Sequence, residues 1–360
     1  MGASGSKHVQ TQDDLYGSIN CVEEVRDGVF HRTWKTTTSP PKALCFVFHG
    51  VHEHSGRYAE LAAGFTARGV EVHALDHAGH GKSPSYATAP GDVGAAGWKG
   101  LVAAAVALVR ETVQGGKNWE NKLPPIIIFG HSLGSLVAFH VADELCQNPT
   151  VSPSPLVIVP STVVLMGFPT RPGPSAAAPF NLECCNCIPL HCGNFARVVG
   201  GCMEVLGPKL PNSPVNVNHL THDEERLAIV QRDAFHYKGD IQNRTGNQAL
   251  RAVKAATDAC ARGDWGQVRD GKEVITQPGA KSTQPLSFRL LIVHGELDTL
   301  AYPTGSQRLL AAVGGGRSDA AASGERVKMI IYPGLYHELL QETPDERGKV
   351  AGDIYSFCEL

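Results

Sequence analysis

The chain has 360 residues, of which 42% are hydrophobic and 19% charged, the composition of a globular protein rather than a disordered one. Its 32 Lys and Arg against 35 Asp and Glu give a formal charge of −3, so no basic field is present to hold nucleic acid. No apolar run is long enough to cross a bilayer, and residues 1–14 lack the apolar core of a secretory signal. We therefore expect a cytoplasmic protein whose ten cysteines are mostly reduced thiols.

The first six residues, MGASGS, fit the N-myristoylation pattern, with Gly2 as the acceptor and Ser6 as the hydroxyl residue. The alternative is a flexible terminus that matches by accident. One myristoyl chain gives only marginal, reversible binding to membranes, so the motif predicts peripheral association at most. We assign residues 1–27 to a flexible N-terminal segment that carries this lipidation candidate.

Short apolar runs alternate with helix-like stretches along most of the chain. The runs, each followed by Gly, Asp or another turn residue, are 43–48, 70–75, 126–129, 163–166, 290–293 and 327–332. The helix-like stretches are 57–68, 97–113, 135–146 and 304–313. Continuous apolar runs are typical of strands buried on both faces of a parallel sheet, so the alternation predicts an α/β fold. Residues before Thr37 could add antiparallel edge strands.

Residues from about 168 to 287 break this rhythm. We interpret residues 169–285 as an inserted cap, or lid, between two parts of one core domain, residues 28–168 and 286–360. The cap contains five cysteines, Cys184, Cys185, Cys187, Cys192 and Cys202. Ordinary thiols, S-acylation and a metal site with His191 are three interpretations of this cluster, although Cys-Cys-x-Cys lacks the usual spacing of structural zinc ligands.

Residues 130–134, GHSLG, match the pattern G-x-S-x-G. The pattern alone is weak, but an isoleucine-rich run precedes it and a helix-like stretch follows it. This is the strand–turn–helix context of a nucleophile elbow, in which glycines allow a sharp turn and the serine hydroxyl is exposed at the edge of the sheet. The context predicts Ser132 as a nucleophile.

A serine hydroxyl needs a base, and the base needs an orienting acid. In this fold the acid and then the histidine follow the serine along the chain, each in a loop after a strand. Of the sixteen histidines, His337 lies just past the last predicted strand, and Asp298 follows the strand before it, with Glu296 as a rival acid. The backbone N–H groups of Val51 and Leu133 are the candidate donors to a developing oxyanion.

Five segments carry a resemblance to a known family. They are FHGVHEHSGRY at 48–58, DHAGHGKS at 76–83, GHSLG at 130–134, HGELD at 294–298 and YHE at 336–338. Together they resemble the monoacylglycerol lipase and lysophospholipase branch of the α/β-hydrolases, a serine aminopeptidase S33-type family. The resemblance covers roughly residues 28–168 and 286–345. It implies an α/β-hydrolase fold, a mostly parallel central sheet flanked by helices, with an inserted cap.

The same resemblance implies roles for single residues. Ser132 would be the nucleophile, Asp298 the acid and His337 the base, with Val51 and Leu133 as oxyanion donors. Glu53 and Arg57 would lie near the glycerol-binding end, and a loop-bracing ion pair is the equal alternative.

Two positions depart from the family pattern. His52 stands where relatives usually have Gly, and Leu340 replaces a second histidine that some relatives use to contact glycerol. The first puts the shape of the oxyanion loop in doubt, and the second weakens the case for strict monoacylglycerol preference.

The expected function is therefore a serine hydrolase of lipid carboxylic esters, most directly monoacylglycerol, which needs no cofactor or metal. A lysophospholipase, an acyl-thioester hydrolase and a non-catalytic binding protein on a hydrolase scaffold are the alternatives. The expected partners are a lipid ester and, through the lid and a myristate on Gly2, a membrane surface; nucleic acid is not among them.

Overall fold

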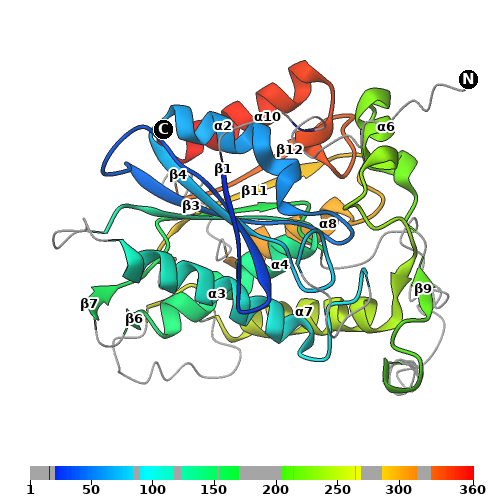
Figure 1. Cartoon of the computed structure of the whole chain (residues 1–360), viewed down its shortest axis with the longest axis horizontal. Helices are drawn as coiled ribbons and strands as arrows, with labels where there is room; N and C mark the ends of the chain where they lie inside the picture. Colours follow the sequence, from blue (N-terminus) through cyan, green and yellow to red (C-terminus); the bar gives the residue numbers. More distant parts are fainter. Residues whose placement is uncertain are drawn as a thin grey trace, which may run out of the picture.

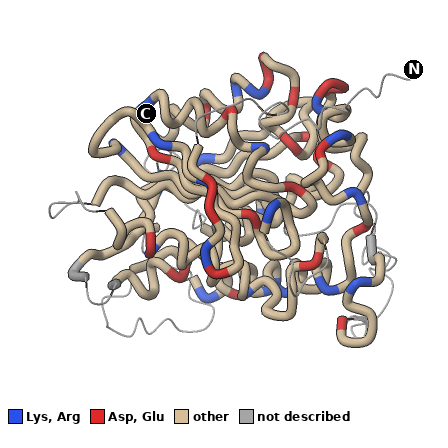
Figure 2. The backbone as a smooth tube through the Cα atoms, in the orientation of Figure 1, with Lys and Arg blue, Asp and Glu red and all other residues tan. Residues whose placement is uncertain are grey.

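The computed structural model describes Tyr16 and residues 21–83, 90–116, 123–151, 154–169, 204–213, 215–263, 265–268, 286–313 and 326–360. The lipidation candidate Gly2 and the cysteine cluster 184–202 lie outside these ranges. Within them, no helix combines the length and hydropathy that crossing a bilayer requires. Figure 2 shows basic and acidic residues interspersed along the backbone in this view, rather than gathered by sign.

An eight-stranded sheet forms the centre of the molecule (Figure 1). Its strand order is β1-β2-β4-β3-β5-β8-β11-β12, and every pair from β4 to β12 is parallel. The two pairs at the β1 edge are antiparallel. The strands span β1 (Cys21–Arg26), β2 (Val29–Trp34), β3 (Ala43–Phe48), β4 (Val70–Leu75), β5 (Ile126–His131), β8 (Thr162–Met166), β11 (Arg289–Gly295) and β12 (Val327–Tyr332).

Helices cover both faces of this sheet (Figure 1). One face carries α2 (Ala59–Ala67) and α10 (Pro344–Phe357), and the other carries α3 (Gly97–Gly115), α4 (Leu133–Gln147), α7 (Asn243–Arg262) and α8 (Pro303–Val313). Alternate residues of β3 supply both cores: Leu44 and Phe46 pack with the α3 and α4 layer, and Cys45 and Val47 pack with the α2 and α10 layer. Because both faces are buried, this strand is apolar throughout, as the sequence indicated.

The remaining described elements are short. They are β6 (Thr150–Val151), β7 (Ser154–Val157), β9 (Pro211–Ser213), β10 (Ile241–Gln242), α6 (Glu224–Arg232) and the 3₁₀ turns η1 (Ser55–Tyr58), η4 (Val217–His219) and η5 (Leu339–Gln341). The element α6 is part of the range expected as a cap, and its Asp223 N-cap accepts hydrogen bonds from the Glu225 and Arg226 N–H groups.

The structure differs from the sequence expectations at two boundaries. The strand β1 begins at Cys21, inside the segment 1–27 that was expected to be flexible, so the ordered core starts earlier than predicted. Within 169–285, α7 packs Ala252, Ala256 and Ala259 into the same core as α3 and α4. This part of the expected cap is therefore a flanking helix of the sheet, while the boundaries of the cap itself stay a prediction.

Candidate active site

Ser132 occupies a strained turn between β5 and α4. Its backbone has φ +52° and ψ −119°, a region that residues with a side chain rarely adopt and that costs about 1–3 kcal/mol. A Cβ on Gly130 would collide with the Gly134 carbonyl, and a Cβ on Gly134 would collide with the carbonyl oxygen of Phe48. Only glycine at these two positions lets strand, turn and helix approach so closely, which explains the spacing G-x-S-x-G.

His337 and Asp298 are bonded to each other. The His337 Nδ1–H donates to Asp298 Oδ2 at 2.6 Å, and both side chains are buried. The other carboxylate oxygen, Oδ1, accepts the backbone N–H groups of Leu300 and Ala301, each at 2.9 Å. His294 Nε2 lies 3.0 Å from Oδ2 on a third side. The carboxylate is therefore fixed, and it leaves the His337 Nε2 as the ring nitrogen available to a hydroxyl.

The environment shifts the pKa values of both members of this pair. Burial alone would raise the pKa of Asp298, but the charge of His337 and the hydrogen bonds from His294 and His337 hold it well below its usual 3.8. Burial alone would lower the pKa of His337, but the negative charge of Asp298 and its hydrogen bond raise it above 6.5. A carboxylate that favours the imidazolium is the electrostatic arrangement of a general base.

Several contacts bring Ser132 to the same place as this pair. The Ser132 N–H donates to the Met166 carbonyl at 2.8 Å, and a Cβ on the next residue, Gly167, would lie 3.2 Å from His337 Cε1. His131, the residue before Ser132, contacts the His337 ring with centroids 4.8 Å apart. The three predicted triad residues thus meet at the carboxyl edge of the parallel strands.

The rival acid lies elsewhere. Glu296 is exposed, and its Oε2 accepts the Gly334 N–H at 3.0 Å. Among the two carboxylates that the sequence offered, only Asp298 is bonded to the imidazole.

The two candidate oxyanion donors flank Ser132. Leu133 is the first residue of α4, so its N–H belongs to the helix-terminal donors that have no acceptor within the helix. Val51 follows Gly50, where a Cβ would lie 3.1 Å from the Cβ of Ser132. His49 joins this loop to the segment after β4. Its Nδ1 contacts the Gly50 carbonyl at 2.7 Å, and its Nε2 accepts the His77 N–H at 2.8 Å. Val51 and Leu133 therefore both lie close to Ser132, and their role as oxyanion donors stays a prediction.

His52 keeps the backbone shape that glycine would allow. Its φ is +69°, in the left-handed region where glycine is favoured. The side chain is buried edge-on against Tyr237, with ring centroids 5.0 Å apart, and the Tyr237 N–H donates to the His52 carbonyl at 2.8 Å. The replacement of glycine therefore adds a contact between the oxyanion loop and the segment after α6.

Glu53 and Arg57 are buried in mutual contact rather than open to solvent. Arg57 Nη1 donates to Glu53 Oε2 at 2.9 Å, and Glu53 Oε1 accepts the Gly50 N–H at 2.5 Å. His131 Nδ1 and the Tyr58 hydroxyl also donate to this oxygen, each at 2.8 Å. These contacts favour the loop-bracing interpretation, while contact with a glycerol group stays a prediction.

Sequence reasoning assigned no role to three residues that complete this arrangement. They are His131 and His294, described above, and Glu338, whose carboxylate receives both Nη1 and Nη2 of Arg57 at 2.7 Å. Each is next to, or four residues from, a predicted triad member and lies inside a segment that carries the family resemblance, so these two signals could have found them.

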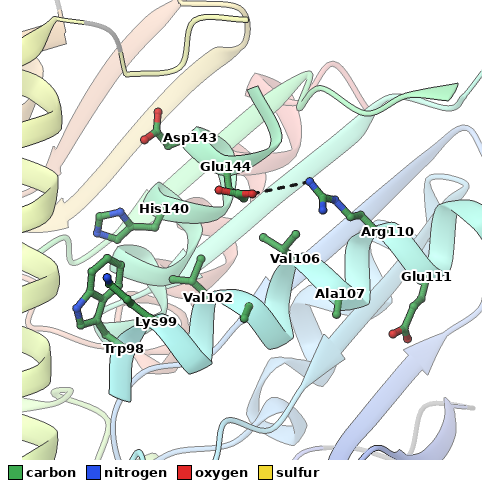
Figure 3. A pocket seen from close by; sticks show the side chains of 11 residues that line it. Trp98, Lys99, Val102, Val106, Ala107, Arg110, Glu111, His140, Asp143 and Glu144 are labelled. Carbon is green, nitrogen blue, oxygen red and sulfur yellow. Dashed lines mark ion pairs between the residues drawn. The ribbon is translucent and has the colours of Figure 1, made fainter. Parts of the chain in front are cut away.

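A separate cavity of about 650 Å³ lies between α3 and α4 (Figure 3). Trp98, Val102 and His140 line it, with the Arg110 and Glu144 ion pair at 3.9 Å on its rim. His140 is eight residues beyond Ser132 on α4, about 12 Å along the helix axis. The residues around this cavity include none of the predicted triad.

The chain matches one family model, described as serine aminopeptidase, S33, over residues 39–344. It is 26% identical to human monoglyceride lipase over 330 residues, covering 91% of this chain and 85% of that protein. It is 28% identical to monoacylglycerol lipase of Mycolicibacterium smegmatis over 329 residues, covering 91% and 92%. A solved structure of monoglyceride lipase from Saccharomyces cerevisiae shares the fold, with TM-score 0.66, 15% identity and coverage of 98% and 96%.

The family match spans most of the chain, including all three predicted triad positions. This chain therefore belongs to the serine aminopeptidase S33 family of α/β-hydrolases and is a hydrolase.

Proposed function

We propose that this protein is a serine hydrolase that cleaves the carboxylic ester bond of lipids, most directly monoacylglycerol, to a free fatty acid and an alcohol. The observation that carries the proposal is the 2.6 Å bond from His337 to Asp298 beside the strained turn at Ser132. The relatives named monoglyceride lipase support the substrate class.

In the first half of the reaction, His337 Nε2 removes the Ser132 proton as Oγ attacks the ester carbonyl. Asp298 holds the imidazole in the tautomer with a proton on Nδ1 and stabilises the imidazolium that forms. The N–H groups of Val51 and Leu133 donate to the carbonyl oxygen as it becomes negative, and one such donor is worth about 3–4 kcal/mol of barrier. His337 then gives its proton to the departing alcohol, which leaves the acyl group on Ser132.

In the second half, water takes the place of the alcohol. His337 removes a proton from this water, the hydroxide attacks the acyl carbonyl, and the same two N–H groups stabilise the second oxyanion. The proton then returns to Ser132 Oγ as the fatty acid leaves. Every group in this sequence belongs to the protein, the ester or water.

Lipid contact is part of the proposal. Val205 and Leu206, within the expected cap, are 78% and 82% exposed, and Leu210 nearby is 51% exposed. Neighbouring exposed apolar side chains are typical of a surface that meets another apolar surface. We propose that this end of the cap contacts the lipid phase, with a myristate on Gly2 as an additional, weak anchor.

The decisive experiment is Ser132→Ala. We expect ester hydrolysis to fall by on the order of 10⁶-fold and labelling by a fluorophosphonate probe to disappear, because both need the Oγ nucleophile. Ser161→Ala is the matched control: this hydroxyl donates to the Ile126 carbonyl at the amino end of β8, at the opposite edge of the sheet. Retained labelling in Ser132→Ala would refute the assignment.

A substrate panel decides the class of ester. Monoacylglycerols, lysophospholipids and acyl-CoA thioesters of matched chain length, assayed with and without vesicles, separate a lipase from a lysophospholipase or a thioesterase. Leu340, in place of a second histidine, leaves less polar recognition of glycerol. Absence of turnover of all three classes by a protein with an intact triad would instead indicate a binding protein on a hydrolase scaffold.

A further inference from the structure

One guanidinium joins two buried carboxylates behind the candidate active site. Arg57 donates through Nη1 and Nη2 to the two oxygens of Glu338, each at 2.7 Å, and through Nη1 to Glu53 at 2.9 Å. The three side chains are 0%, 6% and 4% exposed. Glu338 and Arg57 are 281 residues apart in the chain, so this contact joins the loop after β12 to the loop after β3.

Each carboxylate is adjacent in sequence to a predicted catalytic residue or bonded to a neighbour of one. Glu338 is the residue after His337. Glu53 accepts the Gly50 N–H, which precedes the candidate oxyanion donor Val51, and the Nδ1–H of His131, which precedes Ser132. A single cation therefore connects the base, the oxyanion loop and the nucleophile strand through hydrogen bonds between side chains and backbone.

Further contacts hold the backbone around His337. The Nε2 of His131 lies 3.3 Å from the His337 carbonyl oxygen, and the Glu338 N–H donates to the Leu220 carbonyl at 2.8 Å. The Gln341 Nε2–H donates to the Arg57 carbonyl at 3.2 Å. The Asp298 bond fixes the orientation of the imidazole ring, but these contacts fix where its backbone lies.

We propose that Glu338 is a positioning residue that, through its bidentate bond to Arg57, sets the distance between His337 Nε2 and Ser132 Oγ. The proposal rests on the proposed function, because it concerns the same triad. Bidentate pairing of a carboxylate with arginine is directional as well as strong, so it resists sliding of one loop past the other. Proton transfer between two side chains needs that resistance, since a displacement of about 1 Å can cost on the order of 100-fold in rate.

A merely structural ion pair would stabilise the fold without changing the base. The charged and titratable groups around His337 are Asp298, Glu338, Glu53 and the His131 ring. Glu338 and Glu53 both add to the negative field that raises the pKa of His337. Loss of the Glu338 charge should therefore shift the titration of the base, which loss of stability alone would not do.

The test is Glu338→Gln in the full chain, assayed on a short-chain p-nitrophenyl ester from pH 5 to 9. We expect kcat to fall by on the order of 10- to 100-fold, KM to change little, and the acid limb of kcat/KM to move to lower pH. The control is Glu296→Gln, an exposed carboxylate that also accepts a backbone N–H beside the base loop. We expect its profile to match the wild type.

A second variant keeps the proposal testable if Glu338→Gln does not fold. If Glu338→Gln lacks the wild-type near-ultraviolet circular dichroism, Glu338→Asp decides, because it keeps the charge but shortens the reach by one methylene. A folded Glu338→Asp with reduced kcat and an unshifted acid limb supports positioning. Wild-type kcat and pH profile in whichever variant folds would overturn it. Failure of the proposed function looks different, because the wild type itself would then neither hydrolyse esters nor react with a fluorophosphonate.

Discussion

Two buried carboxylate sites lie near His337, namely Asp298 and the cluster that Glu53 and Glu338 form with Arg57, and they differ in what they bind. Asp298 faces the imidazole ring and accepts hydrogen bonds from two backbone N–H groups and from histidine. Glu338 and Glu53 share the permanent cation Arg57. A carboxylate bonded to histidine can change the protonation of its partner, whereas arginine stays protonated beside a carboxylate and the pair only fixes position.

We therefore expect Asp298 and the Arg57 cluster to have different roles within one site. In the proposed mechanism, Asp298 sets the tautomer and charge of His337, and the Arg57 cluster sets the arrangement of the loops that carry His337, Val51 and Ser132. Both clusters are buried, so removing one member of either leaves a charge or polar group without its partner. The consequences should nevertheless differ: loss of Asp298 should lower the rate most, and loss of Arg57 should lower stability most and the rate to a smaller extent.

The largest effect is expected when the bond between Asp298 and the His337 ring is broken. Asp298→Asn should reduce kcat by on the order of 10⁴-fold, because an amide favours the wrong tautomer of the imidazole while leaving the shape of the site unchanged. Steady-state kinetics on the p-nitrophenyl ester measures this. A loss of less than tenfold would mean that Asp298 does not orient the base.

Breaking the cluster of Arg57, Glu53 and Glu338 should produce the larger loss of stability. Arg57→Met leaves Glu53 and Glu338 buried together without a cation, which should lower the free energy of unfolding by about 3–5 kcal/mol, as urea denaturation would show. The comparison variant is Lys254→Met, which breaks the exposed pair with Asp258 and should cost at most about 0.5 kcal/mol.

The same variant separates the two interpretations of Arg57. If this side chain bound the glycerol end of the substrate, Arg57→Met would raise KM with little change in stability. Equal stability of the wild type and Arg57→Met would contradict the bracing interpretation.

The smallest effect is a pH dependence of the free energy of unfolding that arises from the pair of Asp298 and His337. Because the pKa of Asp298 is depressed, its contribution is complete above the unfolded value of 3.8 and is lost as pH falls through the folded value. Because the pKa of His337 is raised, its contribution is complete below 6.5 and is lost as pH rises through the folded value.

The stability difference between wild type and Asp298→Asn should therefore be largest from about pH 4 to 6.5 and decrease on both sides. Urea unfolding at a series of pH values measures it. A difference that is flat from pH 2 to 9 would show that the two groups are not coupled in the folded state.

Much of the fold was readable from local patterns. The strands β3, β4 and β12 have the predicted limits. For β3 the reason is that a strand buried on both faces is an apolar run with a clear end. The helix α10 was not predicted. Its sequence is mostly polar, and only Val350, Ile354, Tyr355 and Phe357 are buried against the sheet, so the helix depends on tertiary contacts more than on its own pattern.

The sequence by itself indicated the elbow at Ser132 and the candidates Asp298 and His337, since a glycine-flanked serine between strand and helix and the chain order of acid and base are local features. The resemblance already favoured Asp298 over Glu296, but only the tertiary structure showed which of them is bonded to the His337 imidazole and that Arg57 is shared by Glu53 and Glu338. The reason is physical: a turn depends on residues next to one another, whereas an ion pair across 281 residues exists only after the sheet has brought two strand ends together.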